Sequence, residues 1–315
     1  MGNVRFGVNT PQQSFGYERI RDAWREAESC GFESAWLADH FVPYDLAERP
    51  ITEPVLECWV TLSALARDTK TIRLGPLVSC NSYRPPALLA KMAASLDVIS
   101  GGRLNFGIGA GWMRLEHEAY GFLFPNTSER ITRLGEALDI VNKMWTEEKP
   151  TYKGSYYKIV EAVDNPKPVQ KPHPPVYIGA THEKMIRFAA QRADVWNFPS
   201  DVNPCTIADY KDRATILEKR CKEIGRDPKS VRRSWLGIAL LGKNKGDLEE
   251  RMLRLKPKSM DRELFLRGLV GTTDEVIQRI REYVDVGVTE FTLIFPDLNR
   301  EGCLREFSDK VIGKF

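Results

Sequence analysis

Short apolar segments alternate with longer amphipathic segments along the 315 residues of this sequence, and no other feature limits its possible folds as strongly. The apolar segments have the length of buried strands, whereas the amphipathic segments repeat their apolar residues about every 3.6 positions, as helices do. The predicted strands comprise residues 4–8, 34–37, 72–78, 104–108, 176–178, 195–198, 233–241 and 290–295. The predicted helices comprise residues 17–30, 55–66, 85–99, 128–145, 182–191, 207–223, 273–286 and 304–312.

This series predicts one domain over residues 1–315, because no Pro/Gly/Ser-rich linker separates the units. Right-handed crossovers would close the strands into a (β/α)8 TIM barrel, in which active-site loops follow the strands' C-terminal ends. An open doubly wound sheet is the alternative, but it usually carries GxGxxG after its first strand, where this chain has Asn9-Thr10-Pro11. We therefore predict a barrel with an insertion after the fourth strand and another, with a hairpin at 152–160, before the fifth.

Composition narrows the range of partners. The formal net charge of +3 is too small to indicate a nucleic-acid or membrane-surface partner. No uninterrupted apolar run approaches the ~18 residues that a membrane span needs, so we expect a soluble, cytoplasmic protein. The six cysteines form no CxxC pair and the four histidines are scattered, which predicts free thiols and no metal site.

Glycines follow two of the predicted strands, where a barrel would place its active site. Gly107, Gly109 and Gly111 either let a flat ring approach the backbone or simply make a tight bend. Gly179-Ala180-Thr181 lies between a strand and a helix, which favours either a phosphate site or plain capping of the helix by Thr181. Both interpretations stay open for each segment.

Polar residues at other strand ends are candidates for proton transfer. His40 stands next to Asp39 after the second strand, and an imidazole either moves protons near neutral pH or serves as a structural hydrogen-bonding partner. Glu53, Glu57 and Glu116 could face the same end of the barrel or be solvated surface charges. Residues 242–267 are rich in both bases and acids, which favours a solvated helix face over a loop that binds an anion.

Several motifs occur in the order seen in the luciferase-like oxidoreductases. They are residues 39–41 (DHF), 84–87 (RPPA), 100–104 (SGGRL), 107–112 (GIGAGW), 153–157 (KGSYY), 168–179 (PVQKPHPPVYIG), 193–197 (ADVWN) and 271–276 (GTTDEV). Each fragment is common, but the combination spans nearly the whole chain. The sequence thus resembles this family, and most of all the branch that uses the deazaflavin coenzyme F420.

The resemblance implies where a cofactor would bind. It places a non-prolyl cis peptide at about Leu77-Val78, before Ser79, behind the central ring of the cofactor. The ring would lie near Asp39 and the glycines at 107, 109 and 111, with its phosphate at 179–181. Alcohol- and sugar-phosphate-oxidising relatives use a histidine at the His40 position and an aromatic residue at the Tyr44 position.

The substrate pocket is then expected at Tyr44, Trp112 and Glu116. The sugar-phosphate enzymes carry a glutamate directly after the glycines of the fourth strand, where this chain has Trp112, and this difference argues against a sugar-phosphate substrate.

The predicted function is hydride transfer between F420 and a small organic substrate, with His40, and Asp39 beside it, as the catalytic residues. One alternative is an FMN-dependent monooxygenase supplied by a partner flavin reductase, and another is a flavin-binding protein without turnover. A flavin-free barrel lyase or hydrolase is the remaining alternative. The resemblance also implies a homodimer formed through the helices at 55–66 and 87–99.

Overall fold

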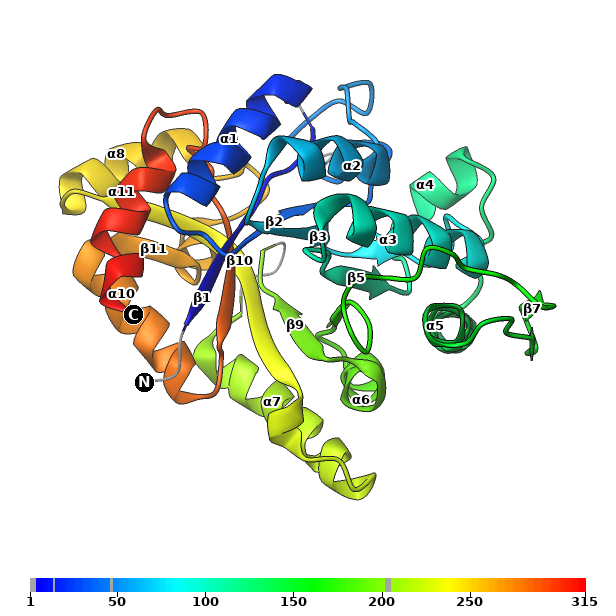
Figure 1. Cartoon of the computed structure of the whole chain (residues 1–315). Coiled ribbons are helices and arrows are strands. Elements are labelled where there is room, and N and C mark those ends of the chain that lie inside the picture. Colours follow the sequence, from blue (N-terminus) through cyan, green and yellow to red (C-terminus); the bar gives the residue numbers. More distant parts are fainter. Residues whose placement is uncertain (1–3, 14, 46–47, 202–204) are drawn as a thin grey trace.

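A parallel sheet curves around the centre of the molecule, and helices surround it (Figure 1). The computed structural model describes residues 4–13, 15–45, 48–201 and 205–315. The strands run in the order β3-β2-β1-β12-β10-β9-β8-β5-β4. Their bounds are β1 Arg5–Asn9, β2 Ser34–Leu37, β3 Arg73–Pro76, β4 Ser79–Cys80, β5 Phe106–Gly109, β8 Val176–Gly179, β9 Val195–Pro199, β10 Arg232–Gly242 and β12 Glu290–Ile294.

The predicted strand at 72–78 is shorter in the structure, where it is β3, and β4 follows it just beyond the predicted end. β3 pairs with β2, and β4 pairs with β5. A parallel bridge between Leu74 and Leu104 also joins β3 to the residues before β5. Because β1 pairs with β12 on the other side, the sheet closes around its interior and the predicted (β/α)8 barrel is confirmed.

Helices follow the strands as the amphipathic segments predict. They are α1 Tyr17–Ser29, α2 Cys58–Asp68, α3 Pro86–Ser100, α4 Arg114–Ala119, α5 Thr127–Thr146, α6 Glu183–Arg192, α7 Ile207–Glu223, α8 Lys245–Leu255, α9 Arg262–Leu266, α10 Thr273–Asp285 and α11 Cys303–Lys310, with short 3-10 turns at Pro228–Ser230 and Ile312–Lys314. Capping boxes at Thr206 and Thr272 begin α7 and α10. α2 begins three residues later than predicted, because Glu57 is extended and its side chain accepts the Val60 amide as an N-cap.

The insertion before β8 contains the predicted hairpin, β6 Tyr152–Lys153 and β7 Lys158–Ile159. The buried carboxylate of Glu136 on α5 accepts the amides of Ser155, Tyr156 and Tyr157, which fixes the hairpin against that helix. The insertion after β5 contains α4, a helix that the sequence pattern does not reveal.

Residues 242–267 differ from the predicted solvated helix face. They form α8 and α9 and lead into an additional strand, β11 Leu269–Thr272, which pairs with β10. Leu248 and Met252 of α8 pack with Phe265 and Val270 in a small hydrophobic cluster of their own. The many charged residues around this apolar face mask it in the sequence pattern. Arg251 is itself buried, where its guanidinium pairs with Asp297.

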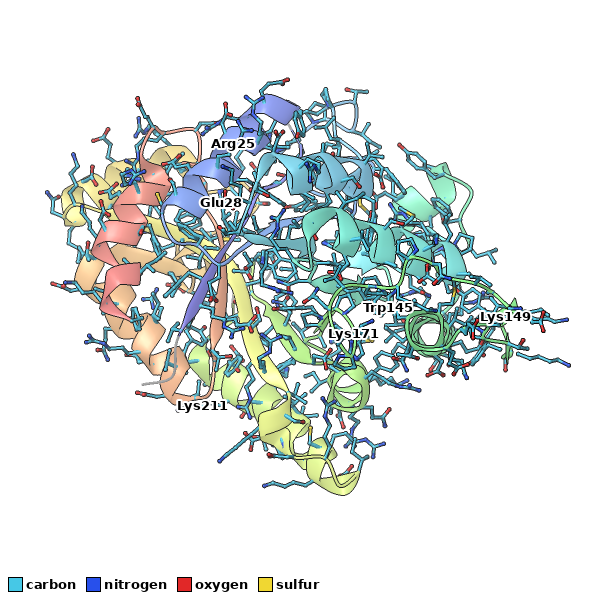
Figure 2. All side chains as sticks on the ribbon, in the orientation of Figure 1. Arg25, Glu28, Trp145, Lys149, Lys171 and Lys211 are labelled. Atoms are coloured by element: carbon cyan, nitrogen blue, oxygen red, sulfur yellow. The ribbon has the colours of Figure 1, made fainter. Side chains whose placement is uncertain are left out.

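The main core lies between the sheet and the helices, while a smaller cluster fills the interior of the barrel. Trp36, Leu77, Tyr177, Val195 and Leu236 form this inner cluster, in which the rings of Trp36 and Tyr177 meet edge to face at 4.8 Å. Charged side chains such as Lys149 and Lys211 project outward from the periphery (Figure 2). None of the helices in the described ranges has the length and apolar character to cross a membrane.

Candidate active site

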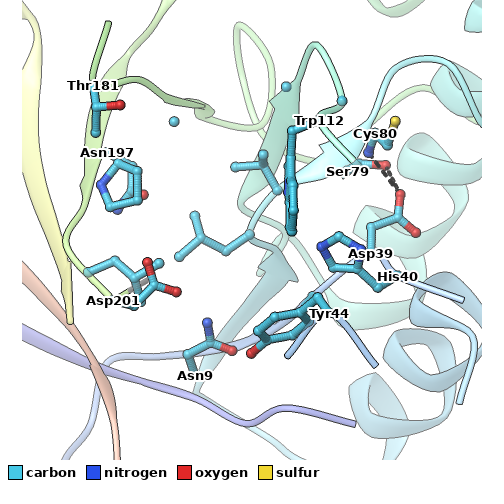
Figure 3. Close-up of a pocket in the computed structure, with 18 of the residues that line it drawn as sticks. Asn9, Asp39, His40, Tyr44, Ser79, Cys80, Trp112, Thr181, Asn197 and Asp201 are labelled. Atoms are coloured by element: carbon cyan, nitrogen blue, oxygen red, sulfur yellow. Dashed lines mark hydrogen bonds between the residues drawn. The ribbon is translucent and has the colours of Figure 1, made fainter. Parts of the chain in front are cut away.

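A cavity of about 660 Å³ opens above the inner cluster, at the C-terminal ends of the strands (Figure 3). This volume is typical of sites for small molecules and cofactors. The predicted site residues that line it are Asp39, His40, Tyr44, Leu77, Val78, Ser79, Gly109, Gly111, Trp112, Gly179 and Thr181. Three others, Gly107, Glu116 and Ala180, lie outside the lining, and Glu116 reaches it through its bond to His40.

The imidazole of His40 is held by a carboxylate from another loop. Its Nδ1 lies 2.8 Å from Oε2 of Glu116, the buried glutamate of α4. With Nδ1 bonded to a carboxylate, the proton resides on that nitrogen, and Nε2 is left as the basic atom. The His40 side chain is 15% exposed and lines the cavity, so this arrangement suits a proton acceptor.

Glu116 is surrounded by hydrogen-bond donors. Besides His40, its carboxylate accepts the Tyr83 hydroxyl at 2.6 Å and the amides of Phe41 and Val42 at 2.5 and 3.1 Å. Burial on its own would raise the pKa of Glu116, but these donors outweigh burial and lower the pKa below its ordinary value. Burial and the nearby Cys80 and Glu116 raise the pKa of Tyr83, so its hydroxyl stays protonated and donates.

Glu116→Gln tests this arrangement without any substrate. We expect it to lower the free energy of unfolding by ~1–3 kcal/mol near neutral pH, because an amide nitrogen would then face donors. Folding lowers the pKa of Glu116. The ionised carboxylate therefore adds its full contribution to the free energy of unfolding above the ordinary pKa of 4.5, and this contribution is lost as the pH falls through the lower pKa of the folded state. The difference between wild type and variant should therefore narrow below pH 4.5 in urea titrations. A pH-independent difference, or an equal effect of Glu118→Gln on the exposed side of α4, would contradict this account.

Asp39 is fully engaged by other protein groups. Its carboxylate receives two hydrogen bonds from Arg84, at 2.7 and 3.0 Å, and others from the Ser79 hydroxyl and the Cys80 amide. Only 3% of Asp39 is exposed, and Arg84 also pairs with Glu57. This set of bonds suits Asp39 to hold β4 in place beside the cavity, and it leaves His40 as the group with a basic atom to offer.

The Val78 side chain and several glycines form the floor of the cavity beside β4. The peptide between Leu77 and Val78 is cis, as predicted from the resemblance. A Cβ on Gly109 would lie 2.8 Å from the Val78 side chain, and one on Gly107 only 2.0 Å from the carbonyl oxygen of Pro76. The absence of side chains on these glycines therefore allows the strands to pack closely against Val78, and Gly109, Gly111 and Gly179 add no side chain of their own to the cavity.

The segment after β8 forms the opposite end of the cavity. The Ala180 amide donates to the Asn197 carbonyl at 3.0 Å, so this amide is already used within the barrel. His182, not Thr181, is the N-cap of α6, and the cap has no side-chain hydrogen bond. Thr181 lines the cavity, and its carbonyl accepts Nε of Arg213 from α7 at 3.0 Å. An arginine beside a helix N-terminus gives this end a positive potential.

Aromatic rings form the wall beside His40. The ring of Tyr44 lies 5.0 Å from the His40 ring, and the ring of Trp112 lies 5.4 Å from it. Trp112 is 59% exposed and comes directly after the αL residue Gly111, where φ is +77°. Burial raises the pKa of Tyr44, and Asp201 and Asp45 raise it further, so its hydroxyl stays protonated.

These features agree with the family comparison. A model of luciferase-like monooxygenases matches residues 3–256. The chain belongs to the luciferase-like monooxygenase family.

Relatives of this luciferase-like chain match it from end to end. The F420-dependent glucose-6-phosphate dehydrogenase of Microbacterium testaceum (strain StLB037) is 29% identical over 347 residues, which cover 99% of this chain and 97% of that enzyme. An F420-dependent secondary alcohol dehydrogenase, solved with an F420-acetone adduct, superimposes with a TM-score of 0.84 at 19% identity over 98% of each chain. A monooxygenase from Streptomyces bottropensis superimposes with a TM-score of 0.80 at 19% identity, covering 98% of this chain and 99% of that one. Both solved structures share the fold.

Sequence reasoning assigned no role to several residues of this luciferase-like cavity. Asn9, Cys80 and Asn197 stand at strand ends, where the same rule that located His40 makes them candidates for chemistry. Asp201 and Arg213 also line the cavity, but nothing in their local sequence distinguishes them from surface charges. In the part of the chain that the structure describes, no group of three or more His, Cys, Asp or Glu side chains is placed to hold a metal ion.

Proposed function

We propose that this protein is an F420-dependent oxidoreductase that transfers a hydride between F420 and a small organic substrate. The observation that carries the proposal is the His40–Glu116 pair, whose basic Nε2 belongs to a cavity with Val78 and glycines in its floor. A base beside the bound substrate is what the oxidation of an alcohol requires. The names of relatives that align over nearly the whole chain support F420 as the cofactor.

The cavity suits the cofactor, and its residues take different parts in holding it. Leu77, Val78 and Ser79, with Gly109, Gly111 and Gly179, would back the deazaflavin ring, while Gly107 and Ala180 support this floor from behind. Thr181 and Arg213 would face its phosphate. When bound, F420 supplies the hydride acceptor or donor, and the chain supplies orientation and exclusion of water.

His40 would handle the proton of the reaction. As an alcohol carbon loses its hydride, Nε2 of His40 takes the hydroxyl proton and a carbonyl group results. Glu116 keeps the Nδ1 proton in place and stabilises the imidazolium that forms. The rings of Tyr44 and Trp112, which lie beside His40, would shield the reacting carbon from water.

Cofactor titration tests the proposal directly. Purified protein is titrated with F420 and, separately, with FMN, while the quenching of tryptophan fluorescence is followed; Trp112 lines the cavity. We expect micromolar binding of F420 and much weaker binding of FMN. A preference for FMN would instead indicate a monooxygenase served by a flavin reductase, and no binding of either would refute both.

Gly179→Val should separate cofactor binding from folding. A Cβ at Gly179 meets its nearest atom, in Val78, at 3.8 Å, so the barrel tolerates a side chain there while the floor of the cavity becomes filled. We expect F420 affinity to fall at least about tenfold, equivalent to ~1.4 kcal/mol, with little change in Tm. Gly16→Val is the matched control, because its Cβ has similar room, 3.9 Å, outside the cavity. Equal F420 affinity in both variants would place the ring elsewhere.

We also propose that residues 1–315 form one domain and that two copies associate through α2 and α3. The pairing of β1 with β12 supports the single domain, because it joins the two ends of the chain. Exposed apolar side chains on these helices support the dimer; they are Val60, Leu88, Val98 and Ile99. Sedimentation equilibrium would return the mass of a monomer if this surface forms no dimer.

A further inference from the structure

One oxygen atom of Glu116 takes part in two hydrogen bonds at once. Oε2 lies 2.8 Å from Nδ1 of His40, and it also accepts the Tyr83 hydroxyl at 2.6 Å. The other oxygen, Oε1, accepts the amides of Phe41 and Val42. Tyr83 and His40 therefore share the negative charge of the same atom, whereas the two amides bind the carboxylate at its other oxygen.

Neighbouring rings fix Tyr83 in the orientation that makes this bond. Only 6% of the residue is exposed, and it lines the cavity. Its ring lies 4.8 Å from the ring of Phe41 and 5.0 Å from the rings of Phe122 and His117. Burial raises the pKa of Tyr83, so the hydroxyl keeps its proton and is a fixed donor to Glu116.

The other ionisable groups around this pair leave Oε2 to these two donors. They are Asp39, Tyr44, Cys80, Arg84, His117 and Arg130. Asp39 and Arg84 pair with each other, and burial raises the pKa of Tyr44 and raises that of Cys80 to about 12, so both stay neutral. In the described part of the chain, only His40 and Tyr83 bond Oε2 of Glu116.

We propose that Tyr83 is a positioning residue that sets the pH range of the reaction through Glu116. This inference rests on the proposed F420-dependent function. In alcohol oxidation, the carbinol C–H gives its hydride to oxidised F420 and the hydroxyl proton goes to Nε2 of His40, which leaves a carbonyl group and an imidazolium. The charge on Oε2 stabilises the imidazolium, and the Tyr83 hydroxyl reduces that charge. The proton therefore leaves the ring more readily, and His40 becomes a base again.

Tyr83→Phe tests this role, because it keeps the ring and removes only the hydroxyl. Relatives are named for a secondary alcohol and for glucose 6-phosphate, so 2-propanol and glucose 6-phosphate are assayed, and the one that reduces F420 is used. We expect the midpoint of the acidic limb of kcat/KM to rise by about 0.5 to 1 pH unit. Below the midpoint, kcat/KM falls by about three- to tenfold, and at alkaline pH it is nearly unchanged.

The reverse reaction gives a second measurement of the same shift. Reduction of the carbonyl product by reduced F420 requires the protonated ring of His40, so its alkaline limb should also move to higher pH. The dissociation constant of F420 should stay the same. A purely structural role of Tyr83 would lower both rates at every pH and leave the midpoints in place.

Urea titrations show whether Tyr83 acts on Glu116, and they need neither cofactor nor substrate. Burial raises the pKa of Glu116, but the bonds from His40 and Tyr83 lower it, and the net pKa lies below 4.5. The stability difference between wild type and Tyr83→Phe should therefore be present above pH 4.5 and narrow below it. In the Glu116→Gln background, Tyr83→Phe should add no pH-dependent difference.

Tyr17→Phe is the matched control. It removes a hydroxyl that donates to the Asp68 carboxylate at 2.5 Å, outside the cavity, and it should leave both midpoints unchanged.

The outcomes distinguish this inference from the proposed function. If F420 is reduced and the midpoint stays in place or falls in Tyr83→Phe, the inference is wrong and the proposed function stands. The same holds if Tyr17→Phe shifts the midpoint equally, or if the stability difference of Tyr83→Phe does not narrow below pH 4.5. If F420 fails to bind, or binds and neither alcohol reduces it, the proposed mechanism fails and this inference fails with it.

Discussion

His40→Ala will lower kcat by about 100- to 10,000-fold while the dissociation constant of F420 stays the same. The loss follows from the geometry of the ring, because Nδ1 is fixed by Glu116, and His182, the other histidine among the described residues of the lining, lies at the opposite end of the cavity. The same variant should retain its affinity for the substrate, since the ring is expected to act in proton transfer more than in binding. Stopped-flow or steady-state F420 reduction measures kcat, and fluorescence quenching measures cofactor affinity.

A matched substitution separates this effect from a general loss of structure. His173→Gln changes a half-buried histidine that lies outside the cavity, where Nδ1 lies close to the Pro174 carbonyl. It should leave kcat unchanged. If His40→Ala keeps most of the wild-type kcat, or if His173→Gln loses as much, His40 is not the base.

Arg84→Ala will lower the free energy of unfolding by ~3–5 kcal/mol. The reason is the carboxylate of Asp39, which is 3% exposed and would lose both of its bonds to the guanidinium. A buried charge without its counter-ion costs more than the pair contributes, because the remaining carboxylate cannot regain water. Glu57 would lose a partner as well, but it is more exposed and contributes less.

Urea titration of the two proteins measures this difference. Arg187→Ala is the control, because Arg187 pairs with Glu183 at 2.9 Å on an exposed face of α6, and it should change the free energy by at most ~0.5 kcal/mol. If Arg84→Ala lowers the free energy of unfolding by less than ~1 kcal/mol, the Asp39 carboxylate becomes hydrated or protonated at little cost, and this account is wrong.

The barrel was predictable from sequence because its strands and helices each carry their own local pattern. The apolar runs and the glycines at strand ends are short-range signals, and together they located β1, β2, β3 and β5 and most of the cavity floor. β11 and α8 were missed because most of their apolar residues belong to a small separate cluster, within a segment whose charges dominate the pattern. The predicted helix at 55–66 began too early. Glu57 is the N-cap, and its side chain accepts the Val60 amide, so the helix begins after this residue.

The candidate site was predictable only in part. His40 and Trp112 were found because they follow strands, and Glu116 was found only as one of several carboxylates. Its bond to His40 joins residues 76 positions apart, and no spacing in the sequence encodes such a pairing. Arg213 and Asp201 reach the cavity from a helix and a loop for the same reason, through tertiary packing alone.

The short helix α4 gives this barrel a replaceable part. The sheet supplies His40, but the carboxylate that sets its tautomer comes from an inserted segment of six helical residues that contributes no strand. Loops of this kind accept insertions and substitutions far more readily than the strands that carry them. Replacement of this one small helix could therefore change or abolish the basicity of His40 during evolution. The floor of the cofactor cavity and the barrel would stay the same while the chemistry diverges.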